Sequence, residues 1–128
     1  MLYTGAACYA GLAALRTGAD TVHVFCDAAA AAVIRAFSCE LVVHPVLDQV
    51  TVISEVLVDR VCCVQEFGME EIDAWLPRLD CLVIGPGLGR NQSTLGRISL
   101  ILRKAVTLNI PAVIDGDALW QVSIAQFD

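Results

Sequence analysis

Short apolar runs alternate along the chain with longer segments that have helical character. The short runs are rich in β-branched side chains, which favours strands, and lie at residues 21–26, 40–44, 81–84 and 112–114. Pro45 is expected to stop the second strand. The third run is wholly apolar, as expected for a strand that is covered on both faces of its sheet. This alternation predicts β/α units and a mainly parallel sheet.

Helices are predicted where Ala and Leu dominate, or where apolar residues recur every three to four positions. Gly18 is placed to end the first helix, and Asp27 is placed to cap the second. Ser93 or Thr94 is expected to cap the helix that follows a glycine-rich loop. Another helix is expected to start in the last residues. The other predicted helical segments are residues 6–15, 28–37, 70–79 and 95–105.

The composition excludes several classes of protein. Of the 128 residues, 57% are hydrophobic and only 17% are charged, which is too apolar for a disordered segment. A membrane span needs about 20 consecutive apolar residues, and charged residues or histidines interrupt every apolar run well before that. The net charge of −6 argues against nucleic acid or an anionic membrane surface as a partner.

The six cysteines are irregularly spaced, and most lie inside apolar runs. A free cysteine in such a run behaves as a small hydrophobic residue, and no CxxC motif indicates zinc. We therefore expect free thiols and no metal site built from cysteine. Reduced thiols indicate an intracellular, reducing compartment, which is either the cytoplasm or the mitochondrion.

The sequence GPGLGR at residues 85–90 lies between a predicted strand and a predicted helix. This layout can place backbone N–H groups and a helix N-terminus around an anion. A tight turn without a ligand is the alternative. The dinucleotide fingerprint GxGxxG fails because Arg90 stands where the third glycine belongs, and a Walker A ending is missing.

Two acidic residues follow the next predicted strand. Asp115 and Asp117 would lie at its carboxyl end, where open α/β sheets bind ligands. They could hold a metal, act as a base or cap a helix. His23 and His44 lie in or at the end of predicted strands, and a core or rim position is favoured over a role as ligands.

Six segments together resemble one family, the nucleotide-dependent NAD(P)H-hydrate dehydratases, a branch of the ribokinase-like fold. These segments cover most of the chain: YTGA at 3–6, ALRTGAD at 14–20, HVFC at 23–26, ELVVHPVL at 40–47, WLPRLDCLVIGPGLGR at 75–90 and IPAVIDGDALW at 110–120. The resemblance implies a three-layer α/β/α, mainly parallel sheet that is incomplete at both ends. Residues 1–128 would form a single partial domain.

Members of this family repair hydrated NADH and NADPH by phosphorylating the added hydroxyl group and then eliminating phosphate. The resemblance therefore implies a lyase that dehydrates the S form, with ATP or ADP as phosphoryl donor and Mg²⁺ as cofactor. Asp115 and Asp117 would face the site. The resemblance also assigns four residues to the part of the site that surrounds the hydrated dinucleotide: Ala6, Gly85, Gly87 and Gly89.

The chain also departs from the family pattern. The family's catalytic aspartate belongs to a G-x-G-D loop that these 128 residues do not contain, so we expect an incomplete version without a catalytic residue of its own. Residues 50–66 have no recognised counterpart and are predicted to be an insertion. Ala118 replaces the usual glycine.

Two other functions stay open at this point, and so does a homo-oligomeric state. One is a non-catalytic Rossmann-type nucleotide-binding module, against which Arg90 argues. Such a module would bind intact NADH rather than the hydrate. The other is an inactive truncated or mis-spliced product.

Overall fold

The computed structural model describes residues 3–47 and 69–124, and these form a mixed α/β structure. All four predicted strands are present; the first three are somewhat shorter than their apolar runs, and the fourth has the predicted bounds. Residues 50–66, the predicted insertion, lie outside the described part of the chain. The elements in chain order are α1 (Thr4–Arg16), β1 (His23–Cys26), α2 (Ala28–Phe37), β2 (Val42–Pro45), α4 (Met69–Trp75), the 3₁₀ helix η2 (Leu76–Arg78), β3 (Leu82–Ile84), α5 (Gln92–Thr107), β4 (Ala112–Ile114) and α6 (Asp117–Ile124).

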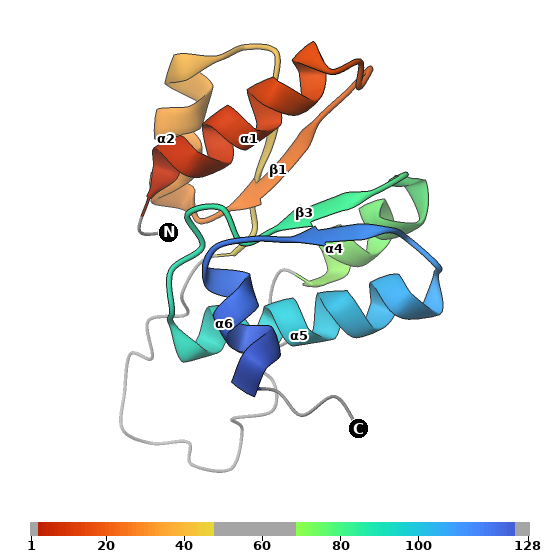
Figure 1. The fold of residues 1–128 in the computed structure, drawn as a ribbon. Helices are drawn as coiled ribbons and strands as arrows, with labels where there is room; N and C mark the ends of the chain where they lie inside the picture. Colours follow the sequence, from red (N-terminus) through yellow and green to blue (C-terminus); the bar gives the residue numbers. More distant parts are fainter. Residues whose placement is uncertain (1–2, 48–68, 125–128) are drawn as a thin grey trace.

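The strands form two parallel pairs. In one pair Phe25 of β1 lies opposite His44 of β2, and in the other Val83 of β3 lies opposite Val113 of β4. Helices α1 and α2 lie on one side of the strands, and α4, α5 and α6 lie on the other (Figure 1). The parallel prediction is therefore confirmed for each pair, and the carboxyl ends of β1 and β3 point to the same side of the molecule (Figure 1).

Two of the three helix ends predicted from the sequence are confirmed. The Asp27 carboxylate accepts a hydrogen bond from the Ala30 N–H (2.7 Å), which caps α2. Gly18 has a φ of +113°, a conformation that suits glycine after the last turn of α1. The expected cap at Ser93 or Thr94 is wrong, because α5 begins earlier, at Gln92, and the Asn91 carbonyl already accepts the Leu95 N–H (2.9 Å).

The second strand does not end before Pro45, as the sequence predicts, but includes it. It is the last residue of β2 and lies opposite Cys26 in the parallel register. Proline is tolerated at a strand position whose missing N–H is not needed by the ladder. The strand therefore runs one residue further than its sequence predicts.

Two apolar clusters hold the layers together. The smaller lies between α1, α2 and the first strand pair and is centred on Ile34 and Cys26, both fully buried. The larger lies between the strands and α4, α5 and α6. Its buried members are Val46, Leu47, Met69, Ile72, Leu76, Ile84, Leu88, Leu95, Ile98, Ile101, Leu102 and Ala118.

The prediction that β3 is covered on both faces is wrong for the described residues. Ile84 is buried and packs toward the larger cluster, whereas Val83 is 52% exposed and its partner Val113 is 59% exposed. Successive side chains of a strand point to opposite faces. An all-apolar strand therefore has apolar side chains on both faces, but the described residues bury only one of these faces.

The described cysteines form no disulfide, in line with the sequence prediction. Cys8 and Cys26 are buried, and Cys39 and Cys81 are exposed. Cys62 and Cys63 lie outside the described residues. None of the helices in the described part of the chain is long and apolar enough to cross a membrane.

Candidate functional site

Three segments that are far apart in the sequence meet at the carboxyl ends of β3 and β4. The first contact joins the glycine loop to the turn after β4. Gly85 has a φ of +125°, and a Cβ atom there would overlap the Asp115 carbonyl oxygen and come within 3.0 Å of the Ala118 Cβ. Only glycine therefore lets the two turns lie this close.

The second contact joins the glycine loop to the start of α1. The Tyr3 N–H donates to the Gly87 carbonyl (3.4 Å), and a Cβ atom at Gly87 would overlap the Tyr3 carbonyl oxygen. That Cβ atom would also lie 3.3 Å from the Cβ of Ala6. Ala6 and Gly87, which are 81 positions apart in the sequence, are thus brought together at one place.

The contact with Tyr3 changes the interpretation of Gly87. Its φ of +68° and the neighbouring Tyr3 carbonyl already require glycine, so the residue type alone is not evidence for a ligand. Its N–H group is a better indication. It has no hydrogen-bond partner among the described residues, whereas the Leu88 N–H donates back to the Gly85 carbonyl (3.1 Å).

The third contact is made by Asp117, the first residue of α6. One carboxylate oxygen accepts the Gly89 N–H (2.9 Å), and the other accepts the Arg90 Nε–H (3.2 Å). The Arg90 guanidinium also lies over the Trp120 ring, 5.5 Å from its centre. The structure therefore shows a role for Asp117 that differs from the three considered above: its carboxylate links the glycine loop to α6.

Asp115 differs from Asp117. Its backbone N–H donates to the Ile84 carbonyl (2.9 Å), and its backbone carbonyl accepts the Ala118 N–H (3.1 Å). Its side chain is exposed and makes no hydrogen bond with another described residue. Asp115 thus leaves a carboxylate at this edge that is accessible to a ligand.

The residues described here do not fit the Mg²⁺ ion that the family resemblance implies. No group of three or more His, Cys, Asp or Glu side chains in residues 3–47 and 69–124 is arranged to hold a metal ion. Asp115 stands alone, and both oxygens of Asp117 are engaged by the loop. We therefore derive no step through a metal ion at this edge.

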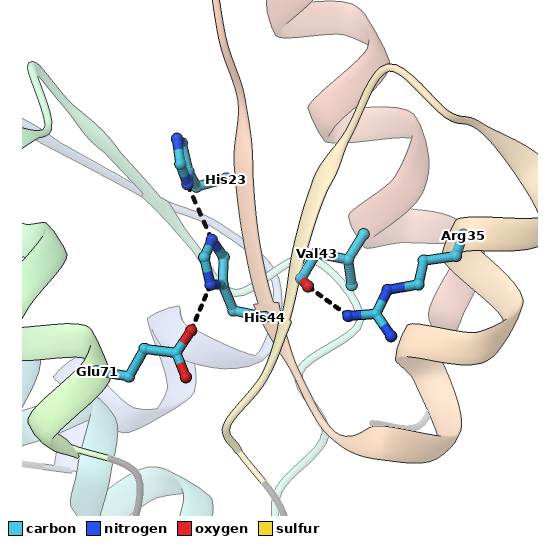
Figure 2. Close-up of polar contacts among 5 residues, drawn as sticks. All are labelled: His23, Arg35, Val43, His44 and Glu71. Carbon is cyan, nitrogen blue, oxygen red and sulfur yellow. Dashed lines mark hydrogen bonds and ion pairs between the residues drawn. The ribbon is translucent and has the colours of Figure 1, made fainter.

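The two histidines form a separate network between the first strand pair and α4 (Figure 2). His44 is buried, and its ring nitrogens face the Glu71 carboxylate (2.6 Å) and the Nδ1 atom of His23 (2.9 Å). The His23 ring also packs on Trp75, with 4.2 Å between centres. Burial, followed by the proximity of His44, lowers the pKa of His23 below its ordinary value.

This network confirms the expectation that the histidines occupy core or rim positions. A buried histidine with partners on both nitrogens has its hydrogen bonds satisfied, so it needs no ligand to account for it. His44 links β2 to α4 through Glu71, and Arg35 of α2 donates to the Val43 carbonyl (2.7 Å) on the other side of the same strand (Figure 2).

A surface hollow of about 270 Å³ lies elsewhere, between α4, η2 and the end of α5. Leu76 and Leu108 line it, together with the ion pair between Asp73 and Lys104 (2.5 Å). It lies at the opposite end of α5 from the glycine loop. Its walls are mostly apolar and its two charged groups are paired with each other, so we place the candidate site at the strand ends instead.

The sequence pointed to the separate parts of this site but not to their contacts. It indicated Ala6, the three glycines and both aspartates, and the structure brings all of them to one edge. It missed Trp120 and the bond between Arg90 and Asp117. The available signal was an arginine at the end of the glycine loop and an acidic residue, Asp117, three positions after the next strand, since strand ends in a parallel sheet share an edge.

Comparison with known proteins shows which proteins this chain is similar to. A family model described as NAD(P)H-hydrate dehydratase matches residues 1–127. The chain is 44% identical over 121 residues to an ATP-dependent (S)-NAD(P)H-hydrate dehydratase from Physcomitrium patens, covering 94% of this chain and 35% of the relative. For the proteins of the same name from Arabidopsis thaliana and Homo sapiens, the identities are 47% and 46%, covering 33% and 30% of each relative. The chain thus spans about a third of the length of these relatives.

Proposed function

The chain belongs to the NAD(P)H-hydrate dehydratase family, and on this premise we propose that it forms the substrate side of a site that dehydrates the S form of hydrated NADH and NADPH with ATP. The observation that carries the proposal is the meeting of three segments at one edge, where the glycine loop contacts Ala6 through Gly87 and Asp115 through Gly85. In the same proposal the two strand pairs belong to one ribokinase-like sheet.

The reaction determines what the substrate side of the site has to do. In the hydrated dinucleotide, water has added across a double bond of the nicotinamide ring. Transfer of a phosphoryl group to the added hydroxyl turns it into a leaving group. The carbon–oxygen bond then breaks, phosphate departs with the electron pair, and loss of a proton from the neighbouring carbon restores the double bond. The substrate side of the site holds the ring in place through both steps.

The described residues support this holding role. The Gly87 N–H is an available donor beside the start of α1, whose N-terminus favours negative charge. Ala6 is small and exposed at the same place, which leaves room for a ligand. Asp115 offers a carboxylate that can accept a hydrogen bond from a ribose hydroxyl. Asp117 is engaged by the loop, so we assign it no proton transfer.

Titration of the 128-residue chain with three ligands tests the proposal. The ligands are the S form of hydrated NADH, its R epimer and intact NADH. We expect the S form to bind most tightly. Preference for intact NADH would instead support a Rossmann-type binding module, and binding of none of the three would support an inactive product.

A pair of variants locates the bound ligand. Ala6→Val adds bulk beside Gly87, whereas Ala13→Val adds the same bulk at another exposed alanine of α1. We expect the first substitution to weaken binding of the S hydrate and the second to leave it unchanged. Equal effects would mean that the ligand does not lie at the contact between α1 and the glycine loop.

A further inference from the structure

Arg90 is held on two sides, yet its side chain remains accessible. Its Nε–H donates to Asp117 (3.2 Å), and its guanidinium lies over the Trp120 ring, 5.5 Å from the ring centre. The side chain is nevertheless 63% exposed. A long, flexible side chain is thereby fixed at the rim of the glycine loop.

This arrangement contributes little to stability, because exposed ion pairs are weak. Its effect is on orientation. A guanidinium carries five N–H donors, and among the described residues only the Nε–H of Arg90 has a hydrogen-bond partner. The two terminal nitrogens remain available, and they form the planar fork that binds phosphate oxygens in pairs.

Asp117 connects this fork to the loop. Its second oxygen accepts the Gly89 N–H (2.9 Å), so the same carboxylate fixes both the backbone before Arg90 and the side chain of Arg90. An anionic ligand at this edge also has to approach the exposed Asp115 carboxylate. A cation fixed beside the loop offsets that repulsion.

We propose that Arg90 contacts a phosphate group of the bound nucleotide, and that Asp117 and Trp120 are its positioning residues. The inference rests on the proposed function, because the phosphate we assign is in the pyrophosphate of the hydrated dinucleotide. A phosphate of ATP offers the same chemistry, and the choice of ligands in the test separates the two.

The test compares the wild-type chain with Arg90→Gln, Arg90→Lys and Asp117→Asn, using Arg103→Gln as control, since Arg103 is exposed on α5. The probes are the S hydrate of NADH, ATP, inorganic pyrophosphate and the S hydrate of dihydronicotinamide riboside, which has no phosphate. Circular dichroism selects conditions in which all variants are folded.

We expect Arg90→Gln to weaken binding of hydrated NADH about tenfold or more, the scale of a hydrogen bond to a charged group. Binding of the hydrated riboside should not change, because a residue that acts only on the fold would weaken both. Arg90→Lys should be intermediate, because it keeps the charge but loses the fork. Asp117→Asn should lie between wild type and Arg90→Gln, and Arg103→Gln should match wild type.

Each other outcome is decisive. If Arg90→Gln binds hydrated NADH as tightly as wild type does, the inference is wrong and the proposed function stands. If only ATP binding falls, the fork holds the phosphoryl donor, and our assignment to the dinucleotide is overturned. If wild type binds pyrophosphate through Arg90 but no hydrated NADH, the anion contact stands and the proposed function fails. If wild type binds none of the probes, both fail.

Discussion

Replacing Gly85 by alanine tests the close packing that builds the candidate site. Gly85 and Gly18 both have a positive φ of similar size, +125° and +113°. A Cβ atom at Gly85 would overlap the Asp115 carbonyl, whereas a Cβ atom at Gly18 would meet no atom within 4 Å. Gly18→Ala therefore reports the conformational strain alone, and Gly85→Ala reports the strain together with the overlap.

The two contributions have different sizes. A residue held in a sparsely populated backbone region costs about 1–3 kcal/mol, and this cost applies to both variants. Overlap with packed atoms adds about 1–3 kcal/mol, and this cost applies to Gly85→Ala alone. Unfolding in urea, with a slope of about 1–3 kcal/mol per molar for a small protein, measures the difference as a shift of the midpoint. Equal midpoints would refute the close approach of the glycine loop to the turn after β4.

Three further predictions follow from the fold and the family. Because the pKa of His23 is lowered in the folded protein, the unfolded chain takes up a proton first as the pH falls. The free energy of unfolding should therefore decrease as the pH falls below 6.5, the ordinary pKa of histidine. His23→Asn should flatten this pH dependence in urea titrations across pH 5–7. Deleting residues 50–66 should change the free energy of unfolding by less than about 2 kcal/mol, the scale of a core truncation, and a larger loss would show an integral element. A polypeptide of these 128 residues should turn over hydrated NADH with ATP at least about 10²–10⁴-fold more slowly than its relatives, because it contains no G-x-G-D loop. A rate like that of the relatives, measured from the absorbance of the NADH formed, would contradict this prediction.

Local interactions explain why much of the fold could be predicted from the sequence. Asp27 caps the helix that follows it, and Gly18 ends the helix before it, because both act on backbone within a few residues. The start of α5 was predicted too late in the chain, although the residue before Gln92 is Asn91 and asparagine is also favoured directly before a helix. The exposure of Val83 was not predictable, because covering of a strand face depends on which other elements pack there.

The candidate site shows the same division. Strand–loop–helix order and the position of acidic residues at a strand end are properties of the sequence, so the glycine loop and Asp115 could be proposed from it. The bonds from Asp117 to Gly89 and Arg90 span 28 and 27 residues and depend on the register between two parallel strands. Nor could the sequence show that Tyr3 would fill the space beside Gly87.

The central claim is that the glycine loop and the start of α1 bind hydrated NAD(P)H. Amide chemical shifts of the isotopically labelled chain, recorded during titration with the S hydrate of NADH, test it most directly. The account predicts saturable changes at the Ala6, Gly87 and Gly89 amides, with little change at Lys104 and Leu108 beside the hollow at the far end of α5. Changes confined to that hollow, or no change at the glycine loop when the ligand is saturating, would contradict it.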